Sequence, residues 1–90
     1  PVGLRTLGPK EPGYKGRFEG PLPELDAAYH QGTVWPWLLG PFVTSLVKFT
    51  GDVAEGRRIL KEGREMLSEC GIGGISEVYD GDAPHRPNGC

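Results

Sequence analysis

Glycine and proline are concentrated at the two ends of this chain, and their distribution limits where regular structure can form. The 90 residues include 15 Gly and 9 Pro. Ten of these lie in residues 1–23 and seven in residues 71–90, which leaves seven in the 47 residues between. Proline bars a normal helix interior, and glycine weakens one. We therefore expect an ordered middle between two loop-rich flanks, rather than a chain that is disordered throughout.

Net charge and cysteine content exclude several classes of protein. Ten Lys and Arg against 12 Asp and Glu give a net charge of −2, so no nucleic-acid partner is expected. The chain has two cysteines, Cys70 and Cys90, which are too few for a secreted disulfide scaffold. This low cysteine content favours a reduced, cytoplasmic chain. No apolar run approaches the 18 residues of a membrane span, so no membrane partner is expected. The chain begins at Pro1, and we expect it to be a piece of a larger protein.

Residues 1–34 are expected to form a loop segment. The first 29 residues keep neither a helical nor a strand-like apolar period, and four prolines lie between positions 9 and 23. A short extended piece is expected at Leu4 to Leu7. Residues 71–90 are also rich in turn-forming residues and are expected to form a structured loop with a short strand at most.

The first helix of the middle segment is indicated by an apolar stripe with helical spacing. It is expected from about Pro36 to Phe49, although Pro41 should kink it or delay its start. The stripe consists of Trp35, Leu38, Leu39, Phe42, Val43, Leu46 and Val47.

A second helix is indicated from Val53 to Cys70. Asp52 and Glu55 have the spacing of a capping box at its start, and Gly71 suits its C-terminus. The short connection predicts an antiparallel helical hairpin over residues 35–70. Arg58 and Lys61 are expected to pair on the outer face with Glu62 and Glu65. The buried side is expected to comprise Val53, Gly56, Leu60, Gly63, Leu67 and Cys70.

The fold class expected from these elements is all-α, an antiparallel helical hairpin with long loops. We describe the chain as a single partial domain over residues 1–90, with a loop segment (1–34), the hairpin (35–70) and a second loop (71–90). A lone hairpin cannot bury so wide an apolar stripe. It should therefore either self-associate or form one unit of a helical array.

Two clusters of residues could carry chemistry. The first, at positions 29–36, is dense in aromatic and hydrogen-bonding groups that would suit a polyhydroxylated ligand, although its aromatic residues could equally be core residues. The second holds three carboxylates, Glu77, Asp80 and Asp82, which could equally be solvated turn residues. Their spacing with His85 fits no zinc or calcium pattern, and no phosphate-binding loop is present, so we expect no metal and no cofactor.

The string GLRTL at 3–7 is followed by two longer strings that contain the clusters, DAAYHQGTVWPWLLGPF at 26–42 and ISEVYDGDAPHRP at 75–87. In this order they resemble the C-terminal amylo-α-1,6-glucosidase domain of glycogen debranching enzymes. The resemblance implies an (α/α)6 barrel, or α/α toroid, of which the hairpin would be one helix pair. It also implies hydrolysis of α-1,6-linked glucose at glycogen branch points, in which one carboxylic acid protonates the glycosidic oxygen and another carboxylate activates water.

The resemblance places Glu77 at the catalytic base, where glucoamylases carry a similar Ser-Glu-x-aromatic-Asp motif. The substrate-binding residues that it implies are Tyr29, His30, Gln31, Trp35, Asp80, Asp82, His85 and Arg86. No segment matches the family's general acid, and Asp26 is assigned a structural role. The resemblance implies an α-glucan as the substrate of the parent enzyme and the remaining barrel helices as partners of this chain. Because the chain supplies only one of the two carboxyl groups, we expect it to be inert alone.

An alternative from another class is a free-standing helical module, or a weak glycan-binding relic without catalysis. It would self-associate through the stripe formed by Leu39, Phe42, Val43 and Leu46.

Overall fold

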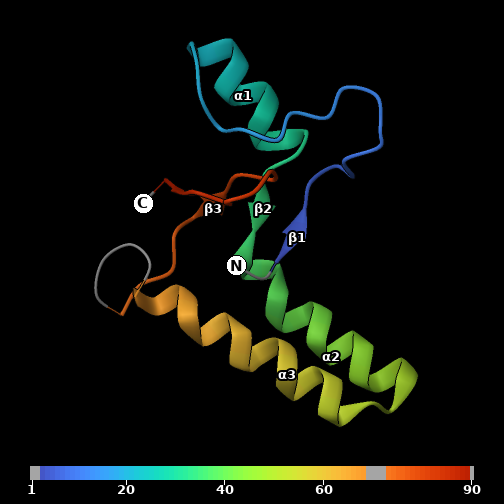
Figure 1. Cartoon of the computed structure of the whole chain (residues 1–90). Coiled ribbons are helices and arrows are strands. Elements are labelled where there is room, and N and C mark those ends of the chain that lie inside the picture. Colours follow the sequence, from blue (N-terminus) through green and yellow to red (C-terminus); the bar gives the residue numbers. More distant parts are fainter. Residues whose placement is uncertain (1–2, 69–72, 90) are drawn as a thin grey trace.

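The structure, a computed structural model, describes residues 3–68 and 73–89. Figure 1 shows a small sheet between helix α1 and a hairpin formed by α2 and α3. The helices are α1 (Leu22–His30), α2 (Leu39–Thr50) and α3 (Val53–Arg64), with 3₁₀ turns at Pro36–Leu38 and Glu65–Ser68. The strands are β1 (Leu4–Arg5), β2 (Val34–Trp35), β3 (Val78–Tyr79) and β4 (Pro87–Asn88).

The expected fold class, all-α with a hairpin resembling one helix pair of an (α/α)6 barrel, is wrong, because a sheet is present beside the hairpin and the chain is α+β. Four strands among the described residues form an antiparallel sheet in the order β1-β2-β3-β4. Leu4 pairs with Trp35, and Val34 pairs with Tyr79. Each strand has two residues, too few for an alternating apolar pattern to be visible in the sequence. The expected extended piece near Leu4 is confirmed as β1.

Helix α1 corrects the expectation of a loop over residues 1–34. Pro21 is its N-cap, and Pro23 lies in its first turn, where the missing N–H costs no helical hydrogen bond. The prolines therefore begin this helix instead of preventing it. Glu24 in the first turn adds a favourable charge near the positive end of the helix dipole.

The helical hairpin is present, with α2 and α3 joined through Gly51 and Asp52. The 3₁₀ turn at Pro36–Leu38 precedes α2, which begins at Leu39. Pro41 therefore falls in the first turn of α2, which confirms the expected delay in the start of this helix. The Oδ1 atom of Asp52 accepts a 2.9 Å hydrogen bond from the Glu55 N–H, which confirms the cap of α3. Glu55 does not complete the box, because its carboxylate binds Arg58.

The predicted inner face of α3 is only partly buried. Gly56 and Gly63 are buried as expected. The prediction is wrong for three apolar residues that remain 40% to 48% exposed: Val53, Leu60 and Leu67. The expected pair of Arg58 with Glu62 is confirmed. Helix α3 ends at Arg64, and the expected end at Cys70 and Gly71 lies outside the described residues.

Close packing of the hairpin depends on Gly56. A Cβ atom there would lie 2.8 Å from Val47 Cγ2 and 3.3 Å from Val43 Cγ1. We expect Gly56→Ala to lower the free energy of unfolding by about 1–3 kcal/mol, although Ala is the better helix former. The control is Gly40→Ala in α2, where a Cβ would meet nothing within 4 Å. Urea denaturation followed by circular dichroism checks this, and equal midpoints for the two variants would contradict it.

The core includes a cluster in which Val34 of β2 and Tyr79 of β3 pack with Met66. Within residues 3–68 and 73–89 the longest helices have 12 residues, and none is long and apolar enough to cross a membrane.

Candidate active site

The two clusters of the sequence meet at a hydrogen bond between Tyr29 and Glu77. Tyr29 lies in the last turn of α1, and Glu77 immediately precedes β3. The Tyr29 hydroxyl donates a 2.6 Å hydrogen bond to Glu77 Oε1 across 48 positions of sequence. This bond, more than partial burial, raises the pKa of Tyr29 above its ordinary value. The Tyr29 hydroxyl therefore stays protonated, and remains a donor to the carboxylate, throughout the neutral range.

Glu77 also borders a groove that contains an exposed tryptophan. The groove has a volume of about 250 Å³ and is lined by Pro36, Trp37, Ile75, Ser76 and Glu77. Trp37 is 66% exposed and Ile75 is 46% exposed. Neither was selected from the sequence. Proximity in sequence is the signal that could have found Trp37, since it directly follows the aromatic cluster.

Trp35, the tryptophan selected from the sequence, is half-buried and supports Tyr29. Its ring centroid lies 4.4 Å from that of Tyr29 at an interplanar angle of 67°. Its Nε1–H donates to Thr33 Oγ1 at 3.0 Å and to the Tyr29 carbonyl at 3.2 Å. These contacts fit the alternative role of a packing residue, and a contact with substrate stays a prediction.

His30 and Gln31 follow Tyr29 and are both exposed. The ring of His30 stands edge-on to Tyr29 with centroids 5.3 Å apart, and its Nε2 lies 3.9 Å from Asp26 Oδ1. The carbonyl of Gln31 accepts a 2.6 Å hydrogen bond from the Lys15 N–H, which ties the end of α1 to the first loop.

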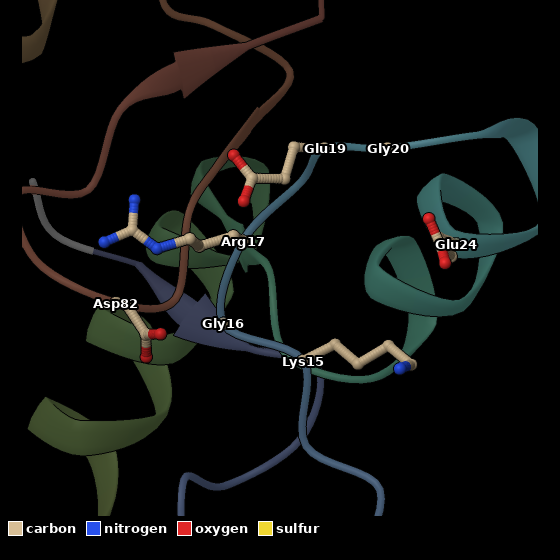
Figure 2. A pocket seen from close by; sticks show the side chains of 7 residues that line it. All are labelled: Lys15, Gly16, Arg17, Glu19, Gly20, Glu24 and Asp82. Atoms are coloured by element: carbon tan, nitrogen blue, oxygen red, sulfur yellow. The ribbon is translucent and has the colours of Figure 1, made fainter.

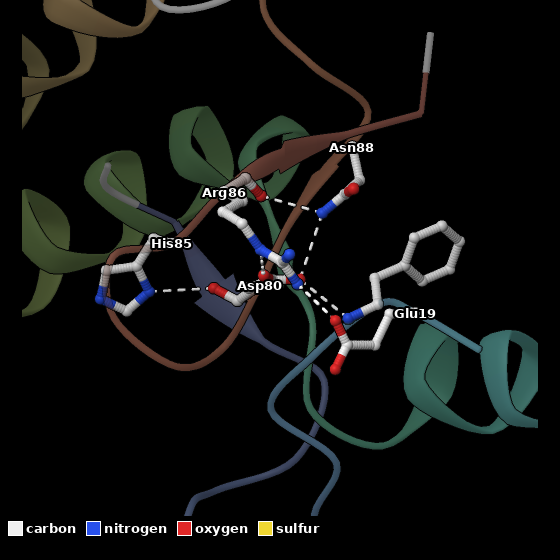
Figure 3. Close-up of polar contacts among 6 residues, drawn as sticks. Glu19, Asp80, His85, Arg86 and Asn88 are labelled. Atoms are coloured by element: carbon white, nitrogen blue, oxygen red, sulfur yellow. Dashed lines mark hydrogen bonds and ion pairs between the residues drawn. The ribbon is translucent and has the colours of Figure 1, made fainter.

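Asp80 is the centre of a polar network and is fully buried. Its Oδ1 accepts hydrogen bonds from the Phe18 N–H at 2.8 Å and from Asn88 Nδ2 at 3.1 Å, and its Oδ2 accepts one from Arg86 Nε at 2.6 Å (Figure 3). The same guanidinium reaches Glu19 at 2.9 Å. The hydrogen bond to Asp80 is the main reason why the pKa of Arg86 is raised.

His85 and Asp82 are also bound within the chain. His85 Nδ1 lies 2.9 Å from the Asp80 carbonyl, and its backbone N–H donates to the Asp82 carbonyl at 2.8 Å. Tyr14 donates a 2.9 Å hydrogen bond to Asp82 Oδ1. Burial first, and this bond second, raise the pKa of Tyr14. These contacts hold the β3–β4 connection, and binding of substrate by Asp80, Asp82, His85 and Arg86 stays a prediction.

A larger hollow lies against the first loop but lacks the features of a binding site. It has a volume of about 700 Å³ and is wide open (Figure 2). The charged side chains around it are all exposed. Among the described residues, no group of three His, Cys, Asp or Glu is placed to hold a metal ion. The lining residues of the hollow are Lys15, Gly16, Arg17, Glu19, Gly20, Glu24 and Asp82.

Comparison with known proteins identified one family. The family described as amylo-alpha-1,6-glucosidase matches residues 1–90, the whole length of the chain. This match confirms the resemblance to the C-terminal domain of debranching enzymes. No curated protein and no solved structure gave a significant match.

Proposed function

Since the chain belongs to the amylo-alpha-1,6-glucosidase family, we propose that it supplies the general base of a glucosidase acting at glycogen branch points. The substrate is an α-glucan that carries a single α-1,6-linked glucose. Glu77 takes a proton from water as the water attacks the anomeric carbon. A carboxylic acid elsewhere in the enzyme protonates the departing glycosidic oxygen, and the configuration of the sugar is inverted.

The observation that carries this proposal is the hydrogen bond between Tyr29 and Glu77. It brings together two of the three strings that carry the family resemblance, at the edge of a solvent-open groove. Among the described residues, Glu77 Oε2 accepts no hydrogen bond, whereas Oε1 accepts that of Tyr29. Glu77 therefore keeps one oxygen available to a water molecule.

The groove beside Glu77 suits a sugar ring. Pyranose rings present a C–H face that packs on aromatic side chains, and the indole of Trp37 is exposed there. Pro36 and Ile75 give the groove further apolar surface. Sites of this kind combine apolar walls with a few polar groups that fix orientation, and here Glu77 and Ser76 are the polar groups. We place the reacting glucose in this groove, against Trp37.

His30 and Gln31, exposed beside Tyr29, remain candidates for contacts with sugar hydroxyls. Asp80 and Arg86 support the site indirectly, because their hydrogen bonds hold β3 and β4 together.

The general acid must come from outside this groove. Inverting hydrolysis uses two carboxyl groups about 6.5–9.5 Å apart on opposite sides of the sugar. Among the described residues, Glu77 is the one carboxylate that lines the groove. No segment of the sequence matches the family's general acid, so we expect residues 1–90 alone to lack the proton donor and to be catalytically inert.

The test compares two substrates and two proteins. We expect the full-length protein to release glucose from a dextrin with a single α-1,6-glucosyl branch and not from the linear α-1,4 dextrin of equal length. We expect the 90-residue chain to release none from either. Glucose release from both dextrins alike would contradict the proposed specificity. No release by the full-length protein, together with dimers of the chain in light scattering, would favour the self-associating module.

A further inference from the structure

We infer that Tyr29 and Gly89 together position Glu77, with a hydroxyl that holds one carboxylate oxygen and a backbone that leaves room for the other. The inference rests on the proposed function, since it concerns how the proposed base is held. Tyr29, which the family resemblance places in the glucose pocket, is here assigned to positioning Glu77. Gly89 was not among the site residues predicted from the sequence.

Tyr29 is rigid enough to act as a positioning residue. Its ring is packed on three sides, by Trp35, His30 and Phe18, with centroid distances of 4.4, 5.3 and 6.0 Å. Its carbonyl accepts hydrogen bonds from the side chains of Thr33 and Trp35. The 2.6 Å distance to Glu77 Oε1 lies in the range of a charge-assisted O–H···O⁻ bond. The hydroxyl is therefore a fixed point for Oε1.

Gly89 packs against the other side of Glu77. A Cβ atom at Gly89 would lie 2.7 Å from Glu77 Oε2 and 2.8 Å from Glu77 Cβ. Because Cβ is the root of the Glu77 side chain, rotation of the carboxylate alone would not relieve the second contact. Gly89 also has a φ of +77°, a conformation that L-residues adopt at a cost. Glycine is thus required for the observed position of Glu77.

The sheet places Gly89 next to Glu77. Val78 pairs with Asn88, and Tyr79 pairs with Pro87, so the residues flanking these pairs face each other. The Asp80 N–H donates to the Arg86 carbonyl at 3.0 Å, and the Asn88 side chain donates to Asp80. The buried Asp80 network thereby sets the distance between Gly89 and Glu77. With Oε1 held by Tyr29, we assign Oε2 as the oxygen that receives the proton of water.

Tyr29→Phe in the full-length protein tests the hydroxyl. We expect kcat to fall by about 10- to 100-fold with KM changed by less than about twofold, since the carboxylate is misplaced but the groove is intact. The control is Tyr14→Phe, which removes the similar bond to Asp82 and should change neither quantity.

Gly89→Ala tests the other side. We expect kcat to fall by about 100-fold because Glu77 must shift. The control is Gly51→Ala, which has nearly the same φ, +71°, but no atom within 4 Å of the added Cβ. The two variants share the backbone strain, so only the contact with Glu77 differs. Equal kcat values in the two variants would overturn the role of Gly89.

A third variant, Glu77→Gln, separates failure of the inference from failure of the proposed function. If it keeps wild-type kcat, Glu77 is not the base. If it is inactive while Tyr29→Phe keeps the wild-type kcat, Glu77 is the base but Tyr29 does not position it. Ultraviolet titration of tyrosinate gives a readout without activity. Because Glu77 raises the pKa of Tyr29, ionisation in Glu77→Gln should begin at lower pH than in wild type.

Discussion

Replacing Glu77 with Gln is expected to lower kcat for hydrolysis of the α-1,6 branch by about 10²- to 10⁴-fold, the contribution of a general base. Gln has the same shape as Glu, and its amide oxygen can still accept the hydrogen bond of Tyr29. It cannot take a proton from water at neutral pH. KM should therefore stay within about twofold, because the interaction lost is made in the transition state.

The control for this variant is Glu65→Gln, which neutralises an exposed carboxylate at the start of the second 3₁₀ turn. It makes the same change in net charge away from the groove and should keep the wild-type kcat. Steady-state release of glucose from a singly branched dextrin measures both variants. If Glu77→Gln and Glu65→Gln retain the same activity, the assignment of Glu77 as the base is incorrect.

Replacing Asp80 with Ala is expected to cause the largest loss of stability, about 3 kcal/mol in the free energy of unfolding. The buried carboxylate accepts hydrogen bonds from the Phe18 N–H, Arg86 and Asn88. Its removal leaves the Phe18 N–H without its acceptor. Within the described part of the chain, Arg86 then keeps Glu19 alone as its anionic partner. The pairing of β3 with β4, which places Gly89 beside Glu77, would loosen as a result.

The neighbouring Asp82 supplies the matched control. It is exposed, and among residues 3–68 and 73–89 its carboxylate accepts a hydrogen bond from a single side chain, that of Tyr14. Asp82→Ala should change the free energy of unfolding by less than about 1 kcal/mol. Urea denaturation of both variants gives the comparison. An Asp80→Ala variant as stable as Asp82→Ala would show that the network does not hold the strands.

The helical hairpin could be predicted because its signals are local. The cap at Asp52, the close approach at Gly56 and the pair of Arg58 with Glu62 each depend on residues within four positions or on one facing helix. The sheet could not be predicted, because each strand has two residues and each partner lies in a distant segment. Helix α1 was missed because prolines at a helix start resemble prolines that prevent a helix.

The residues of the candidate site were selected from motifs and not from composition. The spacing of apolar residues does not indicate that Tyr29 lies against Glu77, because the two residues are 48 positions apart. The resemblance selected both residues, and the structure adds the bond that joins them. Trp35 and Trp37 look equivalent in sequence, yet the strand half-buries the first and the following 3₁₀ turn exposes the second. The position of Gly89 depends on the pairing of β3 with β4, which the sequence alone does not reveal.

The central claim is that Glu77 activates water directly, and the anomeric form of the product tests it. Proton NMR of the glucose first released from an α-1,6-branched dextrin distinguishes the two anomers before they equilibrate. A base that directs water to the far side of the sugar inverts its configuration, so the account predicts β-glucose. Initial release of α-glucose would contradict it, because retention requires a carboxylate that bonds covalently to the sugar.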